Sequence, residues 1–403
     1  MNKIIGAFLI LFTTSSCFAQ ELSKADFLED LVYLKTTLPQ RHINLFSKIS
    51  EKDFNAKVAE IELKADSLNY DTFTAELFKL IVAIGDEHTS ISPNYAKILP
   101  IKFEQFAEGI YVTGIDAKAV NLMLGKLTAI NGISMEEISK RFRTVILHEN
   151  PSYFSVSLLN YLNNPNFLRG LKIINSTDEA TYTLTDTTGK EKNITLKTVL
   201  KSENNNMTFN ESYFSMLATK SNDFYWYDYN EQKKVLYFNY AKCREMEKKP
   251  ISKFNEELFA LIESKKPTKI ILDLRNNSGG NSAILDPFIQ KIKKSYLNNK
   301  KHFFVLIGKK TFSSALMNAV ELKRNLSVTL VGEPTSGNIN HYGEVRGFTL
   351  PKTKLTIGYS TKYWETWRGK KGALTPDINI NYSVINFKNA EDEALNFIAK
   401  TYK

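Results

Sequence analysis

The chain has 403 residues, which is longer than one ordinary hydrophobic core and suits two or three domains. Its composition, 43% hydrophobic and 24% charged, is that of a globular protein and argues against extended disorder. The formal net charge is +10, but the lysines are scattered, and no basic run interleaved with aromatic residues indicates a nucleic-acid surface. We therefore expect no nucleic-acid partner.

The first residues follow the order of a secretory signal. Lys3 precedes an apolar run over 4–12, and small residues then lead to Ala19. The run is too short for a stable membrane anchor, so we predict a signal peptide over 1–19 and an exported protein that is periplasmic, cell-surface or secreted. Cys17 leaves a second interpretation open, in which this cysteine carries a lipid anchor. No other segment is apolar for long enough to span a bilayer.

Cys243 is the only cysteine that remains once the predicted signal is removed. An intrachain disulfide is then impossible, and stability must come from the core. Cys243 lies in a strand-like apolar segment, which favours a buried small hydrophobe over a nucleophile. Because no CxxC, HExxH or similar spacing occurs, we expect neither a metal site nor a cofactor.

Residues 20–98 are predicted to form an N-terminal helical cap. Apolar residues recur at helical spacing in three segments, 26–34, 54–65 and 73–84. Pro39 is expected to end the first helix, and Gly85 is a stop signal for the third. The loop after Gly85 then holds the polar segment Asp86-Glu-His-Thr-Ser90.

Residues 99–200 have the character of a compact β-rich domain. Strand signals occur at 109–113, 126–130, 180–185 and 193–199, with a short helix at 135–142. An Asn131-Gly132 turn follows the second strand, as in a hairpin. The polar segment 201–206 is predicted to link this domain to the next.

Residues 201–403 alternate between strand and helix patterns. Strands are predicted at 235–240, 270–274, 302–307 and 328–331, with helices at 252–263, 284–292 and 314–323 and a final helix at 390–402. This order is the sequence signature of parallel strands joined by helical crossovers. We therefore predict an α/β core in this part of the chain.

Two strand-to-helix turns of the core are candidates for chemistry, because such turns meet at the carboxyl edge of a parallel sheet. Gly279-Gly280 allows a positive φ and leaves amide groups able to point at an anion. Ser313-Ser314 stands where a strand ends and a helix begins, so Ser313, or failing it Ser314, is a candidate nucleophile. The alternative is that one serine is only the N-cap of the helix over 315–323.

Three segments of this core, 270–280, 311–315 and 330–337, resemble the tail-specific, or C-terminal-processing, serine peptidases. The second departs from the family pattern, with Phe312 before the serine and Leu316 where an acidic residue is common. The register of the segments places the family nucleophile on Ser313. The resemblance also implies an α/β fold whose βα core is crotonase-like.

The same resemblance tests the general base. Lysine-type members of the family carry a lysine directly after the third segment, whereas this chain has Asn338, whose amide cannot accept a proton as an amine does. The tricorn-type branch resembles the chain better, because it takes a histidine from an N-terminal segment similar to residues 85–90. The resemblance thus implies His88 as the base, with an unperturbed pKa near 6.5. On position alone, His341 is the rival.

The tricorn-type branch orients its histidine with a glutamate that precedes a Pro-Asp pair. Here Pro376-Asp377 is such a pair, so the resemblance implies Glu365 as the third group, with Glu344 as the alternative. The family pattern also assigns the oxyanion to the backbone N–H groups of Ser314 and of a glycine in Gly279-Gly280.

The β-rich domain is similar to a PDZ-like domain in the segments 109–113 and 124–132, although no peptide-binding glycine loop is evident. Such domains bind an extended chain end as an added strand. We therefore expect an exported serine-type peptidase that hydrolyses polypeptides through an acyl-enzyme at a Ser-His-Glu site. The alternative is a catalytically inactive protein that binds peptides or apolar ligands on the same scaffold.

Overall fold

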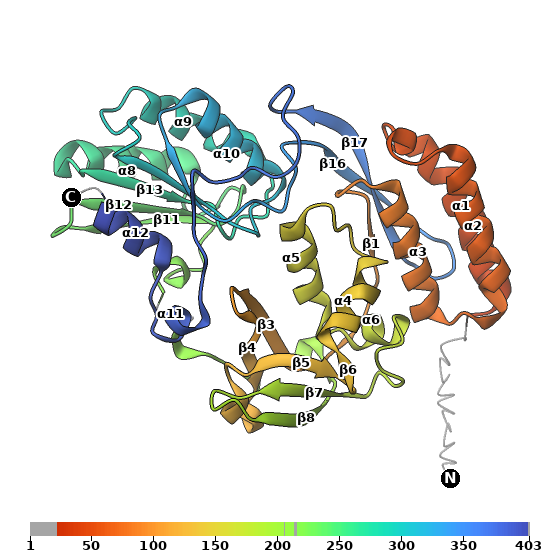
Figure 1. The fold of residues 1–403 in the computed structure, drawn as a ribbon. Helices are drawn as coiled ribbons and strands as arrows, with labels where there is room; N and C mark the ends of the chain where they lie inside the picture. Colours follow the sequence, from red (N-terminus) through yellow and green to blue (C-terminus); the bar gives the residue numbers. More distant parts are fainter. Residues whose placement is uncertain (1–21, 205, 213–215, 402–403) are drawn as a thin grey trace, which may run out of the picture.

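The computed structural model describes residues 22–204, 206–212 and 216–401. The predicted signal peptide and Cys17 lie outside these residues. Figure 1 shows a helical region at one end of the molecule, a layered sheet with helices at the other, and a long β-hairpin between them. A second, strand-rich region lies below the hairpin in this view.

The N-terminal region consists of three helices, as predicted: α1 (Lys24–Arg41), α2 (Glu51–Lys64) and α3 (Tyr70–Ile84). The expectation that Pro39 ends the first helix was wrong, because α1 continues to Arg41. Proline removes one intrahelical hydrogen bond, and this position is so close to the end that the loss disturbs only the last turn. The next turn is closed by the His42 N–H, which donates to the Leu38 carbonyl at 3.0 Å.

Gly85 ends α3 in the left-handed conformation (φ 75°), and its N–H donates to the Ile81 carbonyl at 3.1 Å, so the predicted stop is confirmed. The loop that follows leads into β1 (Ser90–Ser92). This short strand pairs antiparallel with β17 (Thr356–Glu365), far along the chain. His88 therefore lies two residues before a strand that is paired with the C-terminal half of the chain.

The strand-rich region is built on one seven-stranded sheet with the order β10-β4-β5-β7-β8, to which β3 and β6 add on β4 and β5. Its strands are β3 (Ile101–Phe106), β4 (Gly109–Asp116), β5 (Lys126–Ile130), β6 (Ile133–Ser134), β7 (Glu179–Thr185), β8 (Glu191–Lys197) and β10 (Met207–Phe209). The two short strands β2 (Lys97–Ile98) and β9 (Val199–Leu200) pair with each other. The predicted strands and the Asn131-Gly132 turn are confirmed, and both turn residues have positive φ.

Three helices lie in this region, and only the first was predicted. They are α4 (Met135–Arg143), α5 (Pro151–Tyr161) and α6 (Pro165–Gly170). Both missed helices begin with an Asn-Pro pair, in which the asparagine side chain accepts backbone N–H groups of the first turn and proline takes the first helical position. That pair was a readable start signal.

The C-terminal core is a six-stranded sheet with the order β11-β12-β13-β14-β15-β18. Its strands are β11 (Tyr225–Asn230), β12 (Val235–Tyr240), β13 (Lys269–Asp273), β14 (Phe303–Ile307), β15 (Thr329–Gly332) and β18 (Ile378–Asn379). Every pair from β12 to β18 is parallel, and only β11 runs antiparallel. The predicted βα order is therefore confirmed.

Helices cover both faces of this sheet, which explains why its central strands are apolar on both sides. On one face Ile270 and Leu272 pack in the same cluster as residues of α8 (Ile251–Lys265), α9 (Asp286–Lys293) and α10 (Ser313–Asn325). On the other face Ile271 packs in the cluster of α12 (Glu393–Thr401). The short helix α11 (Val384–Lys388) precedes α12 (Figure 1).

The hairpin of β16 (Asn340–Thr349) and β17 connects the two ends of the molecule (Figure 1). It leaves the core after β15, but its apolar residues, including Phe348, Leu355 and Ile357, belong to the same hydrophobic cluster as the N-terminal helices. The hairpin therefore holds the His88 loop against the core.

Candidate active site

Ser313 is the first residue of α10 and has a φ of 49°, a left-handed conformation that is strained for a residue with a side chain. No side chain caps this helix, so the predicted alternative of a simple N-cap serine does not describe the geometry. Ser313 is partly exposed, and no hydrogen bond to its hydroxyl occurs among the described residues. The Ser314 hydroxyl, by contrast, is buried and donates to the Gly280 carbonyl at 2.7 Å.

The glycine turn lies directly against this serine. Gly279 has a φ of 110°, and a Cβ at this position would stand 2.9 Å from Ser313 Cβ and 3.0 Å from Ser314 N. A Cβ on Gly280 (φ 136°) would stand 2.2 Å from the Cys243 carbonyl oxygen. Only glycine therefore lets the backbone approach the serine this closely.

The two predicted glycines differ in their amide groups. The Gly279 N–H donates to Asn277 Oδ1 at 2.9 Å and is engaged within the protein. No such bond occurs for the Gly280 N–H or the Ser314 N–H among the described residues, and Ser314 stands in the first helical turn, where N–H groups lack intrahelical partners. Gly280 and Ser314 are thus the donors left available for an anion.

The His88 imidazole is buried between two rings. It stacks on Phe312, with 4.6 Å between centroids and 20° between planes, and on His341, with 5.1 Å and 14°. Neither ring nitrogen has a hydrogen-bond partner among the described residues, so no bond joins His88 to Ser313. Burial, reinforced by the neighbouring His341, lowers the pKa of His88 to about 4 although Asp86 opposes the shift. His88 is therefore neutral near pH 7.

Asp86 anchors the His88 loop to the helical region and the hairpin. Its carboxylate accepts hydrogen bonds from His42 Nε2 (3.1 Å), Thr89 Oγ1 (2.6 Å), Ser360 Oγ (2.6 Å) and the His88 N–H (3.0 Å). Burial alone would raise the pKa of Asp86, but these donors outweigh it and hold the pKa well below its usual range. Sequence reasoning missed this role, although Asp86 stands inside the histidine motif.

The two glutamates considered as the third group lie away from the imidazole. Glu365 is the exposed last residue of β17, opposite Asn340, and borders a pocket of ≈ 620 Å³. Glu344 is exposed on β16 with a φ of 55°. Among the described residues, neither makes a hydrogen bond or ion pair with His88. The acid beside His88 is Asp86, which contacts its backbone.

Asn338, at the position of the family lysine, is bound by a second acid of the histidine motif. Its N–H donates to Glu87 Oε1 at 3.0 Å and its Nδ2 donates to Glu87 Oε2 at 2.9 Å. Burial raises the pKa of Glu87 to about 8, with Asp86 adding to the shift while the Asn338 N–H and Lys48 oppose it. No local sequence pattern predicts this contact, because it joins loops from opposite halves of the chain.

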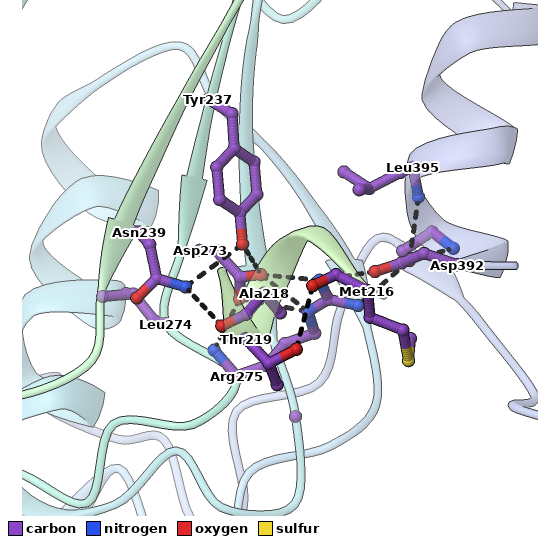
Figure 2. Close-up of polar contacts among 12 residues, drawn as sticks. Met216, Ala218, Thr219, Tyr237, Asn239, Asp273, Leu274, Arg275, Asp392 and Leu395 are labelled. Carbon is purple, nitrogen blue, oxygen red and sulfur yellow. Dashed lines mark hydrogen bonds and ion pairs between the residues drawn. The ribbon is translucent and has the colours of Figure 1, made fainter. Parts of the chain in front are cut away.

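A buried ionic cluster fixes the start of the glycine turn (Figure 2). Arg275 binds both oxygens of Asp273, through Nε at 3.0 Å and Nη2 at 2.6 Å, and reaches Asp392 and the Tyr382 hydroxyl, each at 3.1 Å. Tyr237 donates to Asp273 from the other side at 2.7 Å. Burial would lower the pKa of Arg275, but the two carboxylates raise it well above its usual value. The cluster ties the segment after β13 to the C-terminal helices.

Two further expectations concern sulfur and metals. Cys243 is buried, as predicted, and burial raises the pKa of its thiol to about 11, which keeps it protonated. Within the described ranges, no group of three or more His, Cys, Asp or Glu side chains is arranged to hold a metal ion. None of the helices in the same ranges combines the length and apolar character that a membrane span requires.

No protein-family model and no curated protein matches the chain. Solved structures do match: mature CPAF, at 14% identity and a TM-score of 0.64, covers 94% of this chain and 97% of its own. The complex of mature CPAF with lactacystin gives 13% identity and a TM-score of 0.66, with 94% and 98% covered.

A photosystem II D1 C-terminal processing protease also matches, at 12% identity and a TM-score of 0.43, with 94% of this chain and 97% of that chain covered. The likeness to CPAF, over nearly the full length of both chains, establishes that this chain has a mixed α/β fold shared with that protein.

Proposed function

We propose that the protein is an exported serine peptidase of the tail-specific type. The observation that carries this proposal is the strained conformation of Ser313 at the start of α10, with Gly279 packed against it. Such a turn exposes a hydroxyl beside free backbone N–H groups, which is the arrangement that acyl transfer requires. The substrate class is polypeptide.

In the proposed reaction Ser313 Oγ attacks a peptide carbonyl while His88 accepts the hydroxyl proton. The N–H groups of Gly280 and Ser314 stabilise the oxyanion of the tetrahedral intermediate. His88 then donates its proton to the leaving amine as the C–N bond breaks. A water molecule, deprotonated by His88, hydrolyses the resulting ester and restores the Ser313 hydroxyl.

For this chemistry an imidazole nitrogen must reach Ser313. In the described state neither imidazole nitrogen of His88 is hydrogen-bonded to Ser313, so a side-chain rotation or a small closure has to precede the first proton transfer. Glu365 is the third group that the resemblance supplies. Since it is exposed at the end of β17, it would act on His88 only after a shift of that strand end.

The proposal is tested by hydrolysis of an unstructured polypeptide such as casein by the purified, exported form of the chain. We expect cleavage by the wild type and by Ser67→Ala, which changes an exposed serine far from the site along the chain. We expect loss of cleavage in Ser313→Ala and in His88→Ala. Equal cleavage by wild type and Ser313→Ala would contradict the proposal. Absence of cleavage by folded wild type would favour the alternative of an inactive binding protein.

A further inference from the structure

Glu87 belongs to the histidine motif, and the proposed reaction gives it no part, although its carboxyl binds a loop of the C-terminal core. Both oxygens of its carboxyl accept hydrogen bonds from Asn338, one from the backbone and one from the side chain. The two residues are 251 positions apart in the chain. A bidentate contact of this kind fixes orientation as well as distance, so it docks the His88 loop onto the loop after β15.

The contact continues from Asn338 back to the imidazole. The Asn338 carbonyl accepts a hydrogen bond from His341 Nδ1 at 2.8 Å. The His341 ring in turn stacks on His88. Glu87 therefore reaches His88 by two routes, as its neighbour in the chain and through Asn338 and His341, and the four residues form a closed ring of contacts.

Both loops of this ring are held by α5. The Tyr153 hydroxyl donates to the Glu87 carbonyl at 3.2 Å. Asn150, which caps α5, donates through Nδ2 to the carbonyls of Thr335 (3.1 Å) and Ser336 (2.8 Å), just ahead of Asn338. Asn338 and its loop are thus held by further hydrogen bonds, and the Glu87 carboxyl adds to the Asp86 anchor a direct contact between the His88 loop and this loop.

We propose that Glu87 is a positioning residue of the site, which holds the His88 loop beside the Ser313 turn by binding Asn338. This inference rests on the proposed peptidase function and deepens it. It also assigns a purpose to the asparagine at the position of the family lysine, because Asn338 here supports the histidine base.

Glu87 and Asn338 can stay hydrogen-bonded whether the Glu87 carboxyl is ionised or protonated. The groups facing the Glu87 carboxyl are Asn338 from the core, Lys48 from the helical region and Asp86 and Tyr153 from the surrounding loop and α5. Ionised Glu87 accepts both N–H bonds. Protonated Glu87 can keep the backbone N–H bond and donate to the Asn338 amide oxygen once that amide rotates, so the dock survives in both states.

The test compares kcat and KM for casein hydrolysis in wild type, Glu87→Ala, Glu87→Gln, Asn338→Ala and the double alanine variant. Glu149→Ala is the matched control, because it removes an exposed carboxylate that pairs with the same Lys48. We expect Glu87→Ala to lower kcat by about 10- to 100-fold with KM within about two-fold of wild type, since a misplaced base slows chemistry more than binding. Glutamine can accept the Asn338 backbone N–H through its amide oxygen and donate to the Asn338 amide oxygen once that amide rotates, so Glu87→Gln should retain most of the activity.

The double variant should be no slower than Glu87→Ala alone, because both single changes break one contact. If Glu87→Ala does not fold, Asn338→Ala removes the side-chain half of the pair and carries the same comparison. An active wild type with unchanged kcat in Glu87→Ala, or single losses that multiply in the double variant, would overturn the positioning role alone. A wild type that does not cleave at all would instead overturn the peptidase function and this inference with it.

Discussion

The imidazole of His88 lies face to face with the phenyl ring of Phe312, with 4.6 Å between the two centroids. Phe312 directly precedes the proposed nucleophile, so the base and the serine loop are in contact although they come from opposite halves of the chain. In this position neither imidazole nitrogen has a hydrogen-bond partner among the described residues. The contact therefore joins the two parts of the site and holds the imidazole in a position in which it is not hydrogen-bonded to Ser313.

Replacing Phe312 by leucine should release the imidazole. An aromatic stack of this kind is worth about 0.5 to 1.5 kcal/mol, so freeing His88 should raise the rate at which Ser313 is phosphonylated by about two- to ten-fold. The measurement is the second-order rate constant for a fluorophosphonate probe. Tyr296→Leu, at an exposed position of the core, serves as the control. A slower Phe312→Leu variant would show that the ring assists the reaction.

The loss of activity at low pH should follow the lowered pKa of His88. The profile of kcat/KM against pH reports the pKa of the free enzyme's base, which burial lowers to about 4 in His88. We expect kcat/KM to persist below pH 6 and to fall near pH 4. Because His341 contributes to the shift, His341→Asn should move the limb to higher pH. A wild-type limb near 6.5 that His341→Asn leaves in place would contradict the stacked, buried base.

The free energy of unfolding should fall as pH rises from 6.5 to 8. The pKa of Glu87 is about 8 in the folded protein, above the value near 4.3 in an unfolded chain, so the folded state holds an extra proton over this interval. The expected loss is about 2 kcal/mol, at about 1.4 kcal/mol per pH unit. Urea unfolding at several pH values measures it. In Glu87→Gln this part of the slope should disappear; an unchanged slope would assign it to another group.

Substitution of Asp86 should mainly lower stability, whereas substitution of Glu365 should mainly lower activity. Asp86→Asn deprives buried donors of an ionised acceptor and should lower the free energy of unfolding by about 3 kcal/mol.

Glu365 is exposed, so Glu365→Gln should change the free energy of unfolding by about 0.5 kcal/mol or less. The same variant should lower kcat by about ten-fold or more if Glu365 orients His88. Urea unfolding and casein hydrolysis of both variants check this. An unchanged kcat in Glu365→Gln would remove it from the site.

The Arg275 cluster should be intolerant of a change that conserves charge. Figure 2 shows Arg275 between Asp273 and Asp392. Lysine cannot reproduce the bidentate contact with Asp273 together with the bonds to Asp392 and Tyr382. We expect Arg275→Lys to lower the free energy of unfolding by about 3 kcal/mol, because two buried carboxylates lose their full complement of donors. Arg244→Lys, on an exposed arginine, is the control. Equal stability of the two variants would contradict a structural role for the cluster.

The core could be predicted from the sequence because its signals are local. Each central strand is a short apolar run, and Gly85, Gly279 and Gly280 stand where a positive φ is required. The missed helices α5 and α6 are short, and their Asn-Pro starts were overlooked. The predicted helix end at Pro39 was wrong because the free-energy cost of proline in a helix depends on how many helical residues follow it.

The site itself was less accessible to sequence reasoning. Ser313 is a candidate from its place at a strand-to-helix turn, whereas only the resemblance points to His88, and the structure brings the Phe312 ring beside His88. The contacts of Asp86 with His42 and Ser360, and of Glu87 with Asn338, join segments that no local pattern relates. They depend on the β16–β17 hairpin, which carries core residues to the helical region, and only a three-dimensional arrangement can show them.

Covalent labelling by a fluorophosphonate tests the proposed nucleophile most directly. Intact-mass measurement of the treated wild type should show one adduct, and peptide mapping should place it on Ser313. Ser313→Ala should remain unlabelled, and His88→Ala should be labelled far more slowly. A wild type without an adduct, or a Ser313→Ala variant labelled as fast as the wild type, would contradict the assignment of Ser313 as the nucleophile.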